Sequence, residues 1–92
     1  MLKKLIKILK DKDFVLDNKL IDQFDNPSIV KDSIYQISQL IFESSKINHS
    51  TRIKCHEELI KISKQKKCNF SIAHNLNLSS RVYSVLGQNN KA

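Results

Sequence analysis

Apolar residues recur every three or four positions along most of the chain, and this spacing predicts amphipathic helices. Asn26 and Pro27 mark the clearest boundary, because Asn is a favoured N-cap and Pro suits the first helical position. We expect a helix from residue 27 to about residue 46, the longest of the chain. The stripes before and within it consist of Leu2, Leu5, Ile6, Leu9, Leu16, Leu20, Ile21, Phe24, Val30, Ile34, Ile37 and Ile41.

A fourth helix is predicted after the polar link at residues 47–50, with Ser50 or Thr51 as its N-cap. Residues 69–86 are ambiguous between two short helices, one bent helix and a tail. Ser79 is a candidate cap within that stretch and Gly87 a candidate stop, with a polar tail over residues 88–92. The pattern therefore predicts one all-α domain over residues 1–92, a bundle of four principal helices with a short C-terminal helical extension.

Composition supports a single helical core. A chain of 92 residues is the size of one domain, and 40% of its residues are apolar. The sequence contains one Gly and one Pro, too few for a turn-dense β-sandwich or barrel.

The net charge of +7 is unevenly distributed. Residues 1–45 contain seven Lys and seven Asp or Glu, whereas residues 46–92 contain seven Lys and two Arg against Glu57 and Glu58. The basic half, residues 46–92, is expected to attract nucleic acid, phospholipid headgroups or an acidic protein face. Simple solubility is the alternative explanation of the charge.

Several residue types that hold metals lie close together in the basic half, but their spacing is poor. A structural zinc site usually contains a close pair of ligands, such as two Cys separated by two residues. That spacing is absent, and two cysteines do not make a disulfide framework. We expect no metal and no cofactor. The residues considered are His49, Cys55, His56, Cys68 and His74.

The sequence carries no recognisable catalytic group. Gly87 is the only glycine, so a Gly-rich phosphate loop is excluded. His56 and the neighbouring Glu57 and Glu58 point in different directions on a helix and do not converge on one atom. We expect neither an enzyme nor a small-molecule substrate.

The basic start of the chain resembles a signal peptide only superficially, since Lys7 and Lys10 interrupt its apolar stretch. No apolar run exceeds three residues, which is far short of a membrane span. A cytoplasmic protein is expected. The first helix is a candidate for contact with the inner membrane face, although a wall of the bundle is the favoured interpretation.

Residues 72–79 predict one alternative function. Ala73, Asn77 and Leu78 stand where a helix-turn-helix places a small residue, a turn residue and an apolar residue. On this hypothesis the protein is a small nucleic-acid-binding regulator. Its groove contacts would come from Ser79, Ser80, Arg81 and Ser84.

A second set of residues supports a family resemblance over about residues 27–88. Lys46-Ile47, Ser50, the run Glu57 to Ile60, Ser80, Tyr83-Ser84-Val85 and Gln88 together resemble the immunity proteins of pediocin-like (class IIa) bacteriocins. The resemblance implies a small, basic, cytoplasmic protein with an antiparallel four-helix bundle and an extended C-terminal segment. Such proteins protect the producing bacterium from its own bacteriocin.

The same resemblance implies a mechanism based on binding. The expected partner is the complex of bacteriocin with a membrane permease of the mannose phosphotransferase type, bound from the cytoplasmic side, with the C-terminal half selecting the bacteriocin. Tyr83 would be an aromatic anchor, although Tyr83 and Val85 could equally pin the tail to the bundle. An inhibitor of phage or plasmid origin that binds a host protein is a further alternative. The predicted docking residues are Lys61, Lys64, Lys66, Lys67, Arg81, Tyr83 and Val85.

Overall fold

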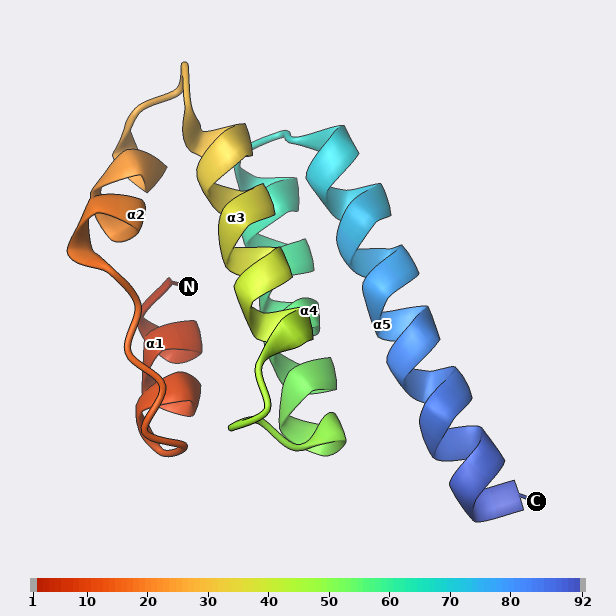
Figure 1. The fold of residues 1–92 in the computed structure, drawn as a ribbon. Helices are drawn as coiled ribbons and strands as arrows, with labels where there is room; N and C mark the ends of the chain where they lie inside the picture. Colours follow the sequence, from red (N-terminus) through yellow and green to blue (C-terminus); the bar gives the residue numbers. More distant parts are fainter. Residues whose placement is uncertain (1, 92) are drawn as a thin grey trace.

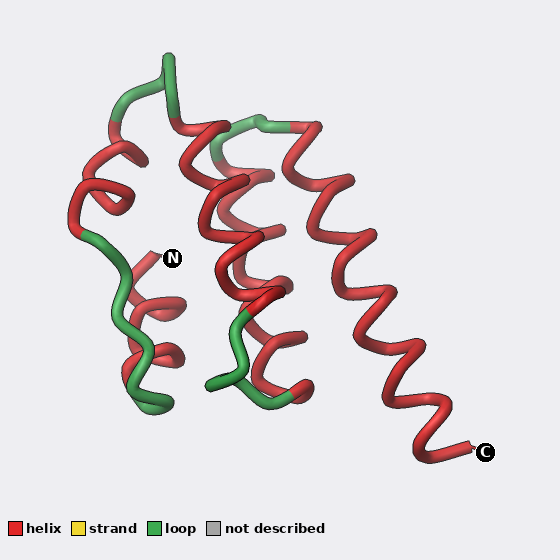
Figure 2. Tube along the Cα trace, viewed as in Figure 1, coloured by secondary structure: helices red, strands yellow, loops and turns green. Residues whose placement is uncertain are grey.

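The computed structural model describes residues 2–91, which form helices and connecting loops with no strand among them (Figure 2). The prediction of an all-α protein is therefore confirmed. The elements are α1 (Leu2–Lys10), α2 (Asn18–Asp22), the 3-10 turn η1 (Gln23–Asp25), α3 (Val30–Glu43), α4 (His49–Gln65) and α5 (Asn69–Lys91).

The helices form a bundle in which α4 is central. Helix α4 packs against α1, α3 and α5, while α2 and η1 pack against α3. Figure 1 shows α1 and α2 on one side of the α3–α4 pair and α5 on the other, with consecutive helices running in alternating directions. The bundle measures 44 × 28 × 18 Å.

The apolar stripes read from the sequence supply the core. Leu5 and Leu9 of α1 are almost completely buried, as are Ile34, Ile37 and Ile41 of α3. Burying each such side chain contributes about 1.5–3 kcal/mol. Helix α1 is thus a wall of the bundle, which is the interpretation that the sequence pattern favours. In the part of the chain described here, no helix is long and apolar enough to cross a membrane.

Buried serines let the central helices approach closely. Ser38 and Ser63 are fully buried, and each hydroxyl donates to a carbonyl of its own helix, at 2.6 Å to Ile34 O and 2.7 Å to Leu59 O. These bonds satisfy the hydroxyl groups without an external partner. The small side chains then leave room for the neighbouring helix.

Two helix starts differ from the prediction. The N-cap of α4 is Asn48, whose Oδ1 accepts from Thr51 N at 2.8 Å, so the helix begins before Ser50 and Thr51. Helix α3 begins at Val30 because Asn26 closes a turn instead of capping the helix directly. Its side chain accepts from Ser28 N at 2.9 Å, and its carbonyl accepts from Val30 N at 3.0 Å.

The C-terminal segment is the longest helix and not a short extension. Helix α5 has 23 residues against 14 in α3, and it continues past Gly87 through residues 88–91; Ala92 lies outside the described residues. Ser79 does not cap a helix, because its hydroxyl donates to Leu76 O at 3.1 Å inside α5. The face of α5 that includes Ser71, Asn75 and Val82 is buried, and α5 packs mainly against α4. This packing overrides the weak local stop signals.

Candidate docking surface

The structure distributes the seven predicted docking residues over separate places instead of one patch. All seven side chains are exposed. Lys66 and Lys67 border a groove at the α4–α5 link, whereas Arg81 and Val85 border a small pocket further along α5. From residue 69 to residue 81 the helix rises about 18 Å, so the groove and the pocket are distinct sites.

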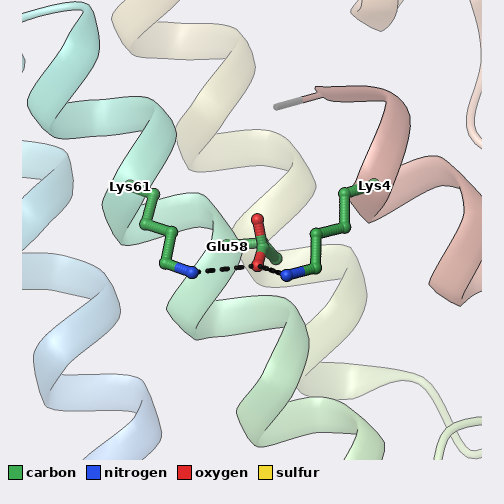
Figure 3. A network of polar contacts seen from close by, with 3 residues as sticks. All are labelled: Lys4, Glu58 and Lys61. Atoms are coloured by element: carbon green, nitrogen blue, oxygen red, sulfur yellow. Dashed lines mark hydrogen bonds and ion pairs between the residues drawn. The ribbon is translucent and has the colours of Figure 1, made fainter.

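Lys61 is engaged in an ion-pair network within the bundle. Its Nζ lies 3.4 Å from Glu58 Oε1, and Lys4 Nζ of α1 lies 3.2 Å from the same oxygen (Figure 3). Glu58 is only 5% exposed, while both lysine ammonium groups reach solvent. The network ties α1 to α4, and solvent screens both pairs because the two lysine side chains are exposed. Lys64 is exposed near the end of the same helix.

The link after α4 holds Lys67 in a left-handed conformation, with φ of 58°. Lys66 N bonds Ile62 O at 2.9 Å and Cys68 N bonds Ser63 O at 2.8 Å, which closes the end of α4. Glycine is the usual residue at such a position, and another residue there costs about 1 kcal/mol. Lys67 therefore keeps a cation beside the groove at some expense in stability.

The groove itself lies where η1, the start of α3 and the start of α5 meet. We call it the basic groove and define it by Phe24, Val30, Lys31, Lys66, Lys67 and Phe70. Its volume is about 500 Å³. Phe24 and Val30 are buried and form its apolar floor, whereas the lysines and Phe70 are exposed. Asp25 is the one acidic residue that lines it.

An exposed aromatic cluster extends the basic groove between α3 and α5. The ring of Tyr35 lies 4.8 Å from that of His74 and 6.3 Å from that of Phe70, measured between centroids. Lys31 Nζ lies 4.8 Å above the Phe70 ring, within the range of a cation–π contact. His74 Nε2 pairs with Gln39 Oε1 at 3.2 Å. Burial and then the charge of Arg81 lower the pKa of His74, which favours the neutral imidazole.

Reasoning from the sequence missed Lys31, Tyr35 and Phe70 as surface residues. Two signals could have found the aromatic residues. Tyr35 falls one position off the buried stripe of α3, beside Ile34, and Phe70 and His74 are four residues apart on one helical face. Their convergence required α3 and α5 to lie side by side.

The small pocket beside Arg81 has a volume of about 120 Å³ and lies next to Arg52. Arg52 is 8% exposed, and its guanidinium donates to Phe42 O, to Ser44 O at 2.7 Å and to Ile47 O. Burial lowers the pKa of Arg52. The positive charge of Arg52 lies beside carbonyl oxygens at the C-terminal end of α3, which is a favourable place for a cation. Arg52 is a structural clamp on the α3–α4 link.

Tyr83 contacts the neighbouring helix and is also exposed to solvent. Its hydroxyl donates to Glu57 Oε1 at 3.4 Å, which links α5 to α4, while 54% of the residue remains exposed. A bond of that length is weak. Tyr83 therefore has a structural contact and an available ring face at the same time.

The helix-turn-helix predicted around residues 72–79 is wrong. The turn expected at Asn77 lies inside α5, which is continuous from Asn69 to Lys91. Of the four predicted nucleic-acid contacts, Ser79 is buried, whereas Ser80, Arg81 and Ser84 are exposed along the same helix. The segment offers no second helix at an angle to the first.

The residues considered for zinc lie in different parts of the bundle. His56 Nδ1 lies 2.9 Å from Asn75 Oδ1 in the interior, and Cys55 is fully buried with its pKa raised to about 11 by that burial. Cys68 is a free thiol that lines the basic groove. Across residues 2–91, no group of three or more His, Cys, Asp or Glu is placed to hold a metal ion.

Comparison with protein-family models, with curated proteins and with solved structures finds no match for this chain. The functional hypothesis therefore depends on the surface residues described above and on the family resemblance in the sequence.

Proposed function

We propose that this protein acts by binding, as an immunity protein of the pediocin-like bacteriocin type. Its partner would be the complex of bacteriocin and mannose phosphotransferase-type permease, engaged from the cytoplasmic side. The observation that carries the proposal is the cluster of exposed aromatic rings and lysines at one end of the bundle. It combines Tyr35 and Phe70 with Lys31, Lys66 and Lys67.

Such a cluster has the composition of a protein interface. Large aromatic side chains supply most of the free energy of binding at interfaces, and surrounding charges accelerate encounter and select the partner. Phe70 is 53% exposed and Tyr35 is 41% exposed, so both rings keep apolar area that a partner could cover. The cluster requires no chemical step, in agreement with the lack of a catalytic motif in the sequence.

The direct test is protection of living cells. Expression in a bacteriocin-sensitive strain should raise the dose of at least one class IIa bacteriocin that is needed to kill the cells. The triple variant Lys66→Glu, Lys67→Glu, Phe70→Ala should lose most of that protection, because it removes the aromatic ring and reverses two charges. Failure of the wild type to protect against a full panel of class IIa bacteriocins would contradict the proposal.

A matched control separates the surface from net charge. Lys7 and Lys54 are exposed on α1 and α4, away from the basic groove. The double variant Lys7→Glu, Lys54→Glu changes the net charge as much as the two lysine reversals in the groove. It should retain protection at the same level of expression.

The nucleic-acid alternative is tested by titration with duplex DNA at increasing salt. The immunity proposal predicts weak binding without sequence preference, governed by net charge alone, so that both charge-reversal variants reduce it equally. Tight, sequence-specific binding that Arg81→Ala weakens would favour a regulator instead.

A further inference from the structure

The basic groove has the features of a receptor for one kind of protein segment. We propose that it binds an acidic amphipathic segment of the partner, whose apolar side chains enter the groove and whose carboxylates meet the lysines at its rim. This inference rests on the proposed function in taking a protein as the partner. It adds the site on this chain and the chemistry of the segment that occupies it.

The shape of the groove favours insertion of side chains over flat contact. Its volume of about 500 Å³ is comparable to that of ligand-binding clefts. Phe24 and Val30 present apolar surface at its floor while the exposed ring of Phe70 stands at its edge. Apolar side chains repeated every three or four residues on a partner helix could lie in such a groove.

The charge at the rim of the groove determines which charge the partner segment must carry. Lys31, Lys66 and Lys67 line the groove against Asp25 alone, so the rim carries an excess of two positive charges. Positive charges beside an apolar floor attract carboxylates and repel basic segments. The expected ligand is therefore both apolar and acidic.

Two local features indicate that these cations are positioned for contact. Lys67 occupies a left-handed backbone position directly after α4, which places its charge at the rim of the groove. Lys31 Nζ lies 4.8 Å above the ring of Phe70, so a cation and an apolar ring stand side by side at the edge of the groove. A carboxylate bound there would contact Lys31 while the neighbouring apolar group covers the ring.

Asp25 favours a protein segment over an anionic lipid surface as the occupant. A membrane rich in phosphatidylglycerol presents negative charge at every position, so it would meet repulsion at Asp25 as well as attraction at the three lysines. A peptide presents separate carboxylates, which can lie at the three lysines and leave a neutral residue beside Asp25.

Cys68 provides a reporter inside the groove. It lines the groove and is only partly buried, whereas Cys55 is fully buried with a raised pKa and should react slowly. The experiment measures alkylation of Cys68 by N-ethylmaleimide in the full chain, by mass spectrometry. It uses a short amphipathic peptide of Glu and Leu as the probe, and the same peptide with Lys in place of Glu as the control.

The Glu–Leu peptide should slow alkylation of Cys68 in a saturable manner, and the Lys–Leu peptide should not. The double variant Lys66→Glu, Lys67→Glu should weaken the effect of the Glu–Leu peptide roughly tenfold, while Lys7→Glu, Lys54→Glu leaves it unchanged. Circular dichroism establishes that both variants are folded, and Lys31→Glu serves as an independent variant on α3. A saturable effect with this pattern supports the proposal.

Three results would overturn it: no effect of the peptide, an equal loss in the two double variants, or stronger protection by phosphatidylglycerol vesicles than by the peptide. The peptide assay contains no permease. Groove-dependent peptide binding without cellular protection would therefore support the groove and contradict the immunity function. Cellular protection without peptide binding would contradict the groove alone.

Discussion

His56 Nδ1 donates to Asn75 Oδ1 at 2.9 Å in the fully buried space between α4 and α5. The direction of the bond follows from Asn75 itself, whose Nδ2 donates to Ser71 O at 2.9 Å and leaves Oδ1 as the acceptor. Burial lowers the pKa of His56 and so favours the neutral imidazole, whose proton then lies on Nδ1. The bond joins the two helices that share the largest contact in the bundle.

The first prediction concerns stability in acid. Burial lowers the pKa of His56 below its ordinary value of 6.5, and the bond to Asn75 opposes this shift only in part. The unfolded chain therefore binds a proton more readily than the folded one. The contribution of His56 to the free energy of unfolding should be constant above about pH 6.5, and it should decrease as the pH falls below that value. Urea denaturation between about pH 8 and about pH 5 measures this dependence.

His74, whose pKa is also lowered, is the control for that experiment. The His74→Gln variant should still lose most of the stability that the wild type loses in acid. The reason is that the imidazole of His74 is less buried than that of His56. His56→Gln should flatten the pH dependence even where it lowers stability at neutral pH. An unchanged slope in His56→Gln would contradict the assignment.

Removal of the Arg52 clamp is the second prediction. Arg52→Ala leaves the carbonyls of Phe42, Ser44 and Ile47 without their donor, and the free energy of unfolding should fall by about 3 kcal/mol. Arg52→Lys should be intermediate, since one ammonium cannot reproduce the planar set of guanidinium donors. Chemical denaturation measures both. The exposed Lys54→Ala should change stability by no more than about 0.5 kcal/mol, and a similar loss in Lys54→Ala and Arg52→Ala would contradict the clamp.

Lys67 supplies a third prediction, in which stability and binding change in opposite directions. Lys67→Gly should raise the free energy of unfolding by about 1 kcal/mol, because glycine adopts a φ of 58° without strain. The same change removes a cation from the basic groove and should weaken both peptide binding and cellular protection. Thermal unfolding and the alkylation assay give the two readouts.

The neighbouring Lys66 tests the third prediction. Its φ is −87°, which needs no glycine, so Lys66→Gly should lower stability by about 0.5–1 kcal/mol. If both glycine variants changed stability in the same direction, strain at Lys67 would not be the cause.

The fourth prediction concerns the two thiols. In the folded protein near neutral pH, N-ethylmaleimide should modify one cysteine quickly, and this should be Cys68. The pKa of the Cys55 thiol is raised to about 11 by burial, so the thiolate that would react is scarce as well as enclosed. Mass spectrometry of the intact protein counts the adducts. Cys68→Ser should show almost no modification until urea unfolds it, and rapid modification of that folded variant would contradict the prediction.

The core was predictable from the sequence because its signal is periodic. Leu5, Leu9, Ile34, Ile37 and Ile41 repeat at helical spacing, and all five are buried. The continuity of α5 was not predictable, because Ser79 and Gly87 carry local signals for a cap and a stop. Packing along α4 outweighs those signals, and such packing depends on residues far away in the sequence.

The candidate surface was predictable only in part. The excess of positive charge in residues 46–92 predicted Lys66 and Lys67 as docking residues, and both border a groove. The groove also includes Phe24, Val30 and Lys31, which lie in the half of the chain whose net charge is zero. A local excess of cations arises there because the fold brings Lys31 to the same groove as Lys66 and Lys67, while Asp25 is the one acidic residue in the lining.

The placement of Phe24 has a consequence for hydrogen exchange. The floor of the basic groove belongs partly to η1, which follows the five-residue helix α2, whereas the opposite side of the groove belongs to the long helix α5. Short elements at the edge of a bundle open more readily than its centre. The amides of residues 18–25 should therefore exchange faster than those at the centres of α4 and α5, and the width of the groove will depend on a part of the bundle that opens readily.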